Sequence, residues 1–74
     1  MNMKPVVWGV LGTAKIGIEQ VIPAMLSSPL VKLRAIASRS LPAAQAAARS
    51  AGIARAYGSY EELLADPAIE AVYN

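Results

Sequence analysis

Strand-like runs alternate with helical segments along the whole chain, and this alternation constrains the fold more than any other feature. The strand-like runs are expected at residues 6–11, 31–38, 53–57 and 69–73. In the second run, Val31, Leu33, Ala35 and Ala37 alternate with Lys32, Arg34, Ile36 and Ser38. The first run is apolar at successive positions, as in a parallel strand that is covered on both faces. Repeated strand–helix–strand units build a parallel sheet, so the sequence predicts an α/β fold with four strands and three helices.

The ends of the helical segments carry recognisable capping residues. The segments themselves are expected at residues 15–27, 43–51 and 60–65. Pro23 removes a backbone donor inside the first segment, so it is expected to kink that helix or to divide it in two. Ser40 can cap the second helix, with Pro42 in its first turn and Gly52 as its left-handed stop. Ser59, followed three residues later by a glutamate, forms a capping box before the third helix.

The composition excludes several classes of site. A chain of 74 residues makes one domain at most. It has no cysteine and no histidine, so we predict no disulfide framework, no metal site and no histidine base. Its basic residues are scattered and its net charge is only +2, which gives little support to nucleic-acid binding. The longest apolar stretch is far below the ~20 residues that span a bilayer, so we expect no membrane partner. The lack of cysteine fits a cytoplasmic location, which we expect.

A glycine-bearing turn, residues 12–17, lies between the first strand and the first helix. Its residues are Gly12, Thr13, Ala14, Lys15, Ile16 and Gly17, in the pattern G-x-A-x-x-G. The usual fingerprint has glycine at the second position, where the backbone approaches a pyrophosphate, and alanine there adds only a methyl group. The amides that open the helix would face the phosphates. A plain tight turn is the alternative, and Lys15 is either a surface residue or a cofactor contact.

The segment after the second strand carries Ser38, Arg39 and Ser40 where an acidic residue would meet the ribose of NAD. Two hydroxyls beside a guanidinium suit a 2′-phosphate, so we predict that NADP is preferred and that NAD is less favoured. The alternative is that Arg39 is a solvated loop residue and Ser40 only a helix cap. We interpret Trp8 and Tyr57 as core residues and not as ligands.

The chain also resembles a known family. The stretches that carry the resemblance are VWGVLGTAKIG (7–17), AIASRS (35–40), AYGSYEELL (56–64) and DPAIEAVYN (66–74). In this order and spacing they are similar to the opening of the Gfo/Idh/MocA oxidoreductases. The resemblance implies that residues 1–74 form the N-terminal part of a dinucleotide-binding Rossmann domain with an incomplete parallel sheet. The C-terminal substrate and catalytic domain of the family is expected to be absent from this chain.

The resemblance further implies an activity and a set of binding residues. Members transfer hydride between a nicotinamide and a hydroxyl carbon of a sugar, polyol or related compound, and the full-length parent is expected to be a homo-oligomer. The family's catalytic lysine lies in a Glu-Lys-Pro motif beyond the fourth strand, so no catalytic residue is expected here. The implied cofactor-binding residues are Gly12, Thr13, Ala14, Lys15, Ile16, Gly17, Ser38, Arg39, Ser40 and Asn74. Alternatives are a stand-alone, non-catalytic NADP-binding module and a truncated product without function.

Overall fold

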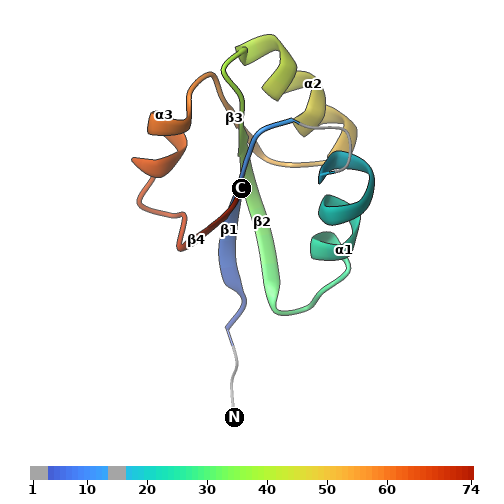
Figure 1. Cartoon of the computed structure of the whole chain (residues 1–74). Helices are drawn as coiled ribbons and strands as arrows, with labels where there is room; N and C mark the ends of the chain where they lie inside the picture. The colour runs from blue at the N-terminus through green and yellow to red at the C-terminus, as the bar shows by residue number, and fades with distance from the viewer. Residues whose placement is uncertain (1–3, 14–16) are drawn as a thin grey trace.

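The computed structural model describes residues 4–13 and 17–74, and its described part forms one parallel sheet with helices on both faces (Figure 1). The elements are β1 (Val6–Leu11), a π-helical segment η1 (Gly17–Val21), α1 (Ile22–Leu26), β2 (Val31–Ala37), α2 (Leu41–Ala51), β3 (Arg55–Tyr57), α3 (Tyr60–Leu64) and β4 (Ala71–Tyr73). The strand order is β3-β2-β1-β4, and every pair is parallel. The predicted Rossmann-type fold is confirmed.

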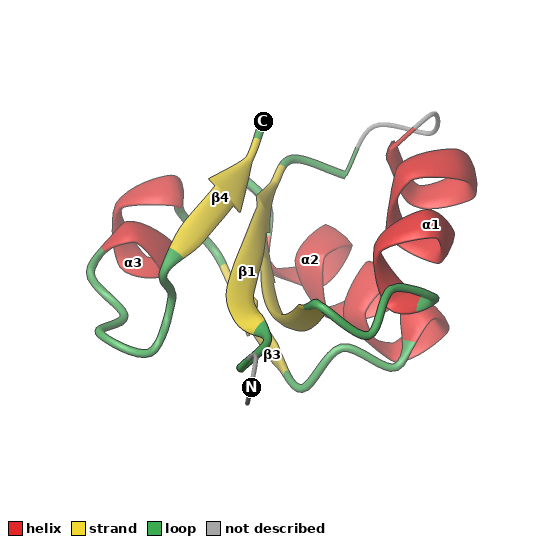
Figure 2. Cartoon of the chain, turned by 90° about the horizontal axis from the view of Figure 1, so that it is seen from below, coloured by secondary structure: helices red, strands yellow, loops and turns green. Residues whose placement is uncertain are grey.

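Three layers are visible when the sheet is viewed along its edge: α1 and α2 lie on one side of the sheet and α3 lies on the other (Figure 2). The core on the α1 and α2 side contains Val10, Ile22, Ile36, Ala47, Ala48 and Ile53. The core on the α3 side is smaller and contains Ala35, Ala37 and Leu63. Alanine is the main contribution of α2 to the core, as expected for a helix whose small side chains allow close approach to a sheet.

Gly9 allows α3 to approach the sheet on its own side. A Cβ atom built on Gly9 would lie 2.7 Å from Cδ2 of Leu63, a side chain with no exposed surface. Any larger residue at position 9 would therefore push against the centre of the smaller core.

An extra residue, Arg34, interrupts the regular pairing of β2 with β1. Trp8 is opposite Leu33, whereas Gly9 is opposite Ala35. Leu33 packs on the α1 and α2 side, and Ala35 is buried on the α3 side, so the two lie on opposite faces although they are two residues apart. Every second residue of the 31–38 run therefore does not lie on the same face of the sheet, and the simple alternation in the sequence is wrong at this point. A β-bulge at Arg34 shifts the side chains by one position.

The helix ends follow the predicted capping chemistry. The first helical segment changes from π-helical to α-helical at Ile22, and Pro23 lies in the first turn of α1, so the expected division of this helix is confirmed. The hydroxyl of Ser40 accepts a hydrogen bond from the backbone of Ala43. Gly52 ends α2 with a φ of 72°. The hydroxyl of Ser59 accepts from the amide of Glu62, which gives the first half of the capping box.

Two strands are shorter than predicted, because their first residues have other hydrogen-bond partners. The amide of Ile53 donates to the carbonyl of Ala48 and so belongs to the end of α2. The amide of Ile69 donates to the carbonyl of Asp66 in the turn after α3. Glu70 contacts β1 in a different way: its amide donates to the carbonyl of Val7, and its carboxylate accepts from the amide of Val7. Among residues 4–13 and 17–74, no helix has both the length and the apolar character needed to cross a membrane.

Candidate functional site

The two segments predicted to bind a dinucleotide begin side by side at the carboxyl edge of the sheet. The amide of Gly12, directly after β1, donates to the carbonyl of Ala37 at 2.8 Å. The amide of Ser38, directly after β2, donates to the carbonyl of Tyr57 at 3.1 Å. The ends of β1, β2 and β3 are thus joined in a row. The strand order also reverses at β1, which has β2 on one side and β4 on the other, and ligands of open α/β sheets bind at such a point.

Gly12 has a φ of 104°, a backbone conformation that residues with a side chain rarely adopt. A Cβ atom there would lie 3.6 Å from the hydroxyl oxygen of Tyr60, which is ordinary contact, so conformation and not space requires glycine. Thr13 is half-buried and Gly17 opens η1. The predicted contacts of Ala14, Lys15 and Ile16 lie outside the described residues.

The Ser38–Ser40 segment offers donors at the same edge. Ser38 is 8% exposed, and its hydroxyl oxygen accepts from the amide of Ser40 at 3.2 Å. The hydroxyl oxygen of Ser40 accepts from the amide of Ala43 at 3.4 Å, so Ser40 does cap α2 as the alternative interpretation required. Each hydroxyl acts as an acceptor in these bonds and keeps its own hydrogen for donation. Arg39 is exposed and has no hydrogen-bond or ion-pair partner among the described residues.

Asn74 is exposed directly after β4. Because β4 pairs in parallel with β1 up to the pair Tyr73 and Val10, Asn74 lies at the same edge as Gly12. Trp8 is half-buried in a central strand and belongs to neither buried core cluster, and its interpretation as a core residue and not a ligand stays a prediction. Glu61 and Glu62 are exposed in the first turn of α3, as expected for residues that favour the start of a helix.

These residues fit a dinucleotide. A glycine with positive φ follows β1, and two hydroxyls follow β2 together with a guanidinium that has no partner among the described residues. Gly12 and Ser38, which begin the two segments, are hydrogen-bonded to the neighbouring strand ends. Acidic side chains are absent from Ser38–Ser40, so nothing in that segment repels a phosphate. No cluster that could hold a metal ion is found within the part of the chain that the structure describes.

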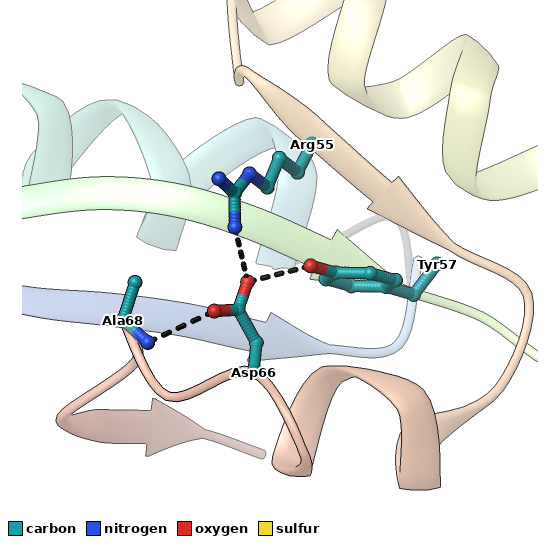
Figure 3. A network of polar contacts seen from close by, with 4 residues as sticks. All are labelled: Arg55, Tyr57, Asp66 and Ala68. Carbon is teal, nitrogen blue, oxygen red and sulfur yellow. Dashed lines mark hydrogen bonds and ion pairs between the residues drawn. The ribbon is translucent and has the colours of Figure 1, made fainter.

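A polar network that was not predicted from the sequence joins β3 to the turn after α3 (Figure 3). The side chain of Asp66 is only 4% exposed and accepts three hydrogen bonds. The hydroxyl of Tyr57 and the guanidinium of Arg55 donate to its Oδ2 at 2.5 and 2.7 Å, and the amide of Ala68 donates to its Oδ1 at 2.9 Å. The sequence signal was available, because Arg55 and Tyr57 are two residues apart on one strand and so share a face.

The network makes the stability of the protein depend on pH in the acidic range. The hydrogen bond from Tyr57, with that from the amide of Ala68, lowers the pKa of Asp66 from 3.8 to about 2. Because the pKa is lower in the folded than in the unfolded state, the stabilisation is present above pH 3.8 and is lost as the pH falls through about 2. We therefore expect Asp66→Asn to lower the melting temperature at pH 7, by a difference that shrinks steadily below pH 4. Melting curves of both proteins from pH 7 to pH 2 measure it, and a constant difference would contradict the assignment.

Comparisons with known proteins identify the family. Residues 6–73 match the sequence profile of Gfo/Idh/MocA, an oxidoreductase family with an NAD-binding Rossmann fold. The chain is 59% identical to an uncharacterized oxidoreductase of Rhizobium meliloti and 53% identical to D-xylose 1-dehydrogenase (NADP(+)) 2 of Haloferax volcanii. Each match covers 89% of this chain and 20% of the relative, so the chain spans about a fifth of the length of these curated relatives.

Solved structures agree. The crystal structure of KijD10, a 3-ketoreductase from Actinomadura kijaniata in complex with TDP-benzene and NADP, matches with a TM-score of 0.88 and 33% identity, over 95% of this chain and 22% of that one. The myo-inositol dehydrogenase from Lactobacillus casei, in complex with NAD(H) and myo-inositol, matches with a TM-score of 0.77 and 29% identity, over 92% and 20% of the two chains. The chain therefore belongs to the Gfo/Idh/MocA family of oxidoreductases and has the family's NAD(P)-binding Rossmann fold.

Proposed function

We propose that this chain forms the nucleotide-binding part of an NADP-dependent oxidoreductase that acts on a hydroxyl carbon of a sugar, polyol or related compound. The observation that carries the cofactor choice is the Ser38–Ser40 segment at the carboxyl edge, with two hydroxyls and a guanidinium that no other described residue pairs with. The NADP in the name of the Haloferax xylose dehydrogenase supports the same choice. The Lactobacillus enzyme of the same fold is in complex with NAD(H), so the fold alone gives no preference and the proposal depends on the segment after β2.

In this proposal the residues of the chain bind and orient the cofactor. The bound nicotinamide supplies the hydride chemistry. Gly12 and Thr13 present backbone to the pyrophosphate, and Ala14, Lys15, Ile16 and Gly17 are the further predicted contacts with it. Arg39 pairs with the 2′-phosphate, Ser38 and Ser40 donate to it, and Asn74 contacts the cofactor from the end of β4. The names of relatives support a sugar or polyol substrate, since they include D-xylose and myo-inositol dehydrogenases.

Removing the guanidinium tests this proposal. We expect Arg39→Ala to weaken NADPH binding about tenfold, as for one charge-assisted hydrogen bond of ~1.5 kcal/mol, and to leave NADH binding unchanged. Titration calorimetry with each nucleotide measures both dissociation constants. Arg49→Ala is the matched control, because it removes an exposed arginine from the last turn of α2 and should change neither constant. Equal affinities of the unaltered protein for NADPH and NADH, with no loss in Arg39→Ala, would overturn the proposal.

A further inference from the structure

The end of β3 holds the start of the Ser38–Ser40 segment. The carbonyl of Tyr57 accepts the amide hydrogen of Ser38, the first residue after β2. This carbonyl belongs to a strand of three residues at the edge of the described sheet, and β2 is its only strand partner there. Short edge strands separate from a sheet more easily than central ones. The position of Ser38 therefore depends on what fastens β3.

The carboxylate of Asp66 binds side chains at both ends of β3. Arg55 and Tyr57 are the first and last residues of β3, and both side chains reach Oδ2 of Asp66 (Figure 3). Asp66 is itself fixed by the amide of Ala68, within the turn that joins α3 to β4. The carboxylate is almost completely buried, so solvent does little to weaken these bonds. β3 is thus joined to β2 through its backbone and to the turn before β4 through its side chains.

We propose that Asp66, through its hydrogen bonds to Tyr57 and Arg55, positions the Ser38–Ser40 segment and thereby sets the preference for a dinucleotide with a 2′-phosphate. The inference rests on the proposed function, because it names residues that act on the same site without touching the cofactor. NADH lacks the 2′-phosphate and does not use Arg39 or the two hydroxyls as phosphate ligands. A shift of this segment therefore weakens the binding of NADPH more than that of NADH.

The test is the ratio of the two dissociation constants. Tyr57→Phe keeps the ring and removes only the hydroxyl that donates to Asp66. We expect the preference for NADPH over NADH to fall about fivefold, the equivalent of one hydrogen bond of ~1 kcal/mol at the phosphate. Ala46→Gly is the control for lost stability: glycine weakens the helix at an exposed position of α2 and should leave the ratio unchanged.

Each outcome decides between the two proposals. A Tyr57→Phe protein that weakens both cofactors equally, or neither, overturns the positioning role and leaves the proposed function intact. If the unaltered protein binds NADPH no more tightly than NADH, the proposed function itself is overturned. If Tyr57→Phe does not fold, Arg55→Gln gives the same decision, because Arg55 is 44% exposed in its side chain and its loss disturbs the core less. A reduced ratio in Arg55→Gln supports the inference, and an unchanged ratio overturns it.

Discussion

Replacing Leu63 by alanine is expected to lower the free energy of unfolding by about 3 kcal/mol. Leu63 has no exposed surface, and among the described residues it is the one large buried side chain of the α3-side core, beside the small buried residues Ala35 and Ala37. Its larger neighbours, Leu11, Tyr57, Tyr60 and Ile69, are only partly buried at the rim, so we expect a cavity to remain. For a chain of this length the total stability is roughly 4 to 11 kcal/mol, so the loss is a large share of it. Urea unfolding followed by circular dichroism measures the change.

Gly9 provides the partner for a double-mutant cycle. Gly9→Ala alone is expected to cost about 2 kcal/mol, because the new methyl group would lie 2.7 Å from Cδ2 of Leu63. In the Leu63→Ala background the same methyl group meets empty space, so its cost should fall below about 1 kcal/mol. Additive effects of the two substitutions would show that Gly9 and Leu63 do not contact each other as described.

The second large effect is expected at Gly12. Gly12→Val places a β-branched residue at a φ of 104°, a strain of about 3 kcal/mol that the loop relieves by moving. NADPH and NADH share the pyrophosphate, so we expect both to bind about 100-fold more weakly, in contrast to the selective effect of Arg39→Ala. Nucleotide titrations of the variant measure this loss directly.

Gly52→Val is the matched control for Gly12→Val. Gly52 also has a positive φ, of 72°, and nothing lies within 4 Å of a Cβ atom built there. The control should therefore lose stability through backbone strain while it keeps both nucleotide affinities. A Gly12→Val protein that loses affinity for NADPH alone, or for neither nucleotide, would contradict the role assigned to the turn.

The fold was predictable because local signals and tertiary structure agree in this chain. Serines at the starts of α2 and α3 and a glycine after α2 cap their helices as their chemistry requires. The errors lie where a residue has a partner outside its own segment. Ile53 and Ile69 look like strand residues, but the amide of Ile53 bonds to the end of α2 and the amide of Ile69 bonds to Asp66 in the turn after α3. The bulge at Arg34 depends on pairing with β1, which no property of residues 31–38 alone reveals.

The candidate site was only partly predictable. Glycine and hydroxyl residues directly after predicted strands indicated which loops meet at the carboxyl edge, and Gly12 and Ser38 do lie there. The Asp66 network was missed because its members come from a strand and from a turn on the far side of α3. Such a contact follows from how tightly α3 packs on the sheet, and Gly9 and Leu63 set that distance.

The bulge at Arg34 also affects how many residues separate the two segments of the proposed site. It lies between the two halves of the proposed site, after Gly12 and before Ser38, and both ends of β2 still pair with β1, Val31 with Val6 and Ala37 with Leu11. A chain without this residue would pair regularly and still bury Leu33 and Ile36 on one face and Ala35 on the other. Spacing between the glycine turn and the ribose-recognising segment can thus change by one residue while the site keeps its shape. Insertions and deletions among homologous proteins are expected to collect at this position.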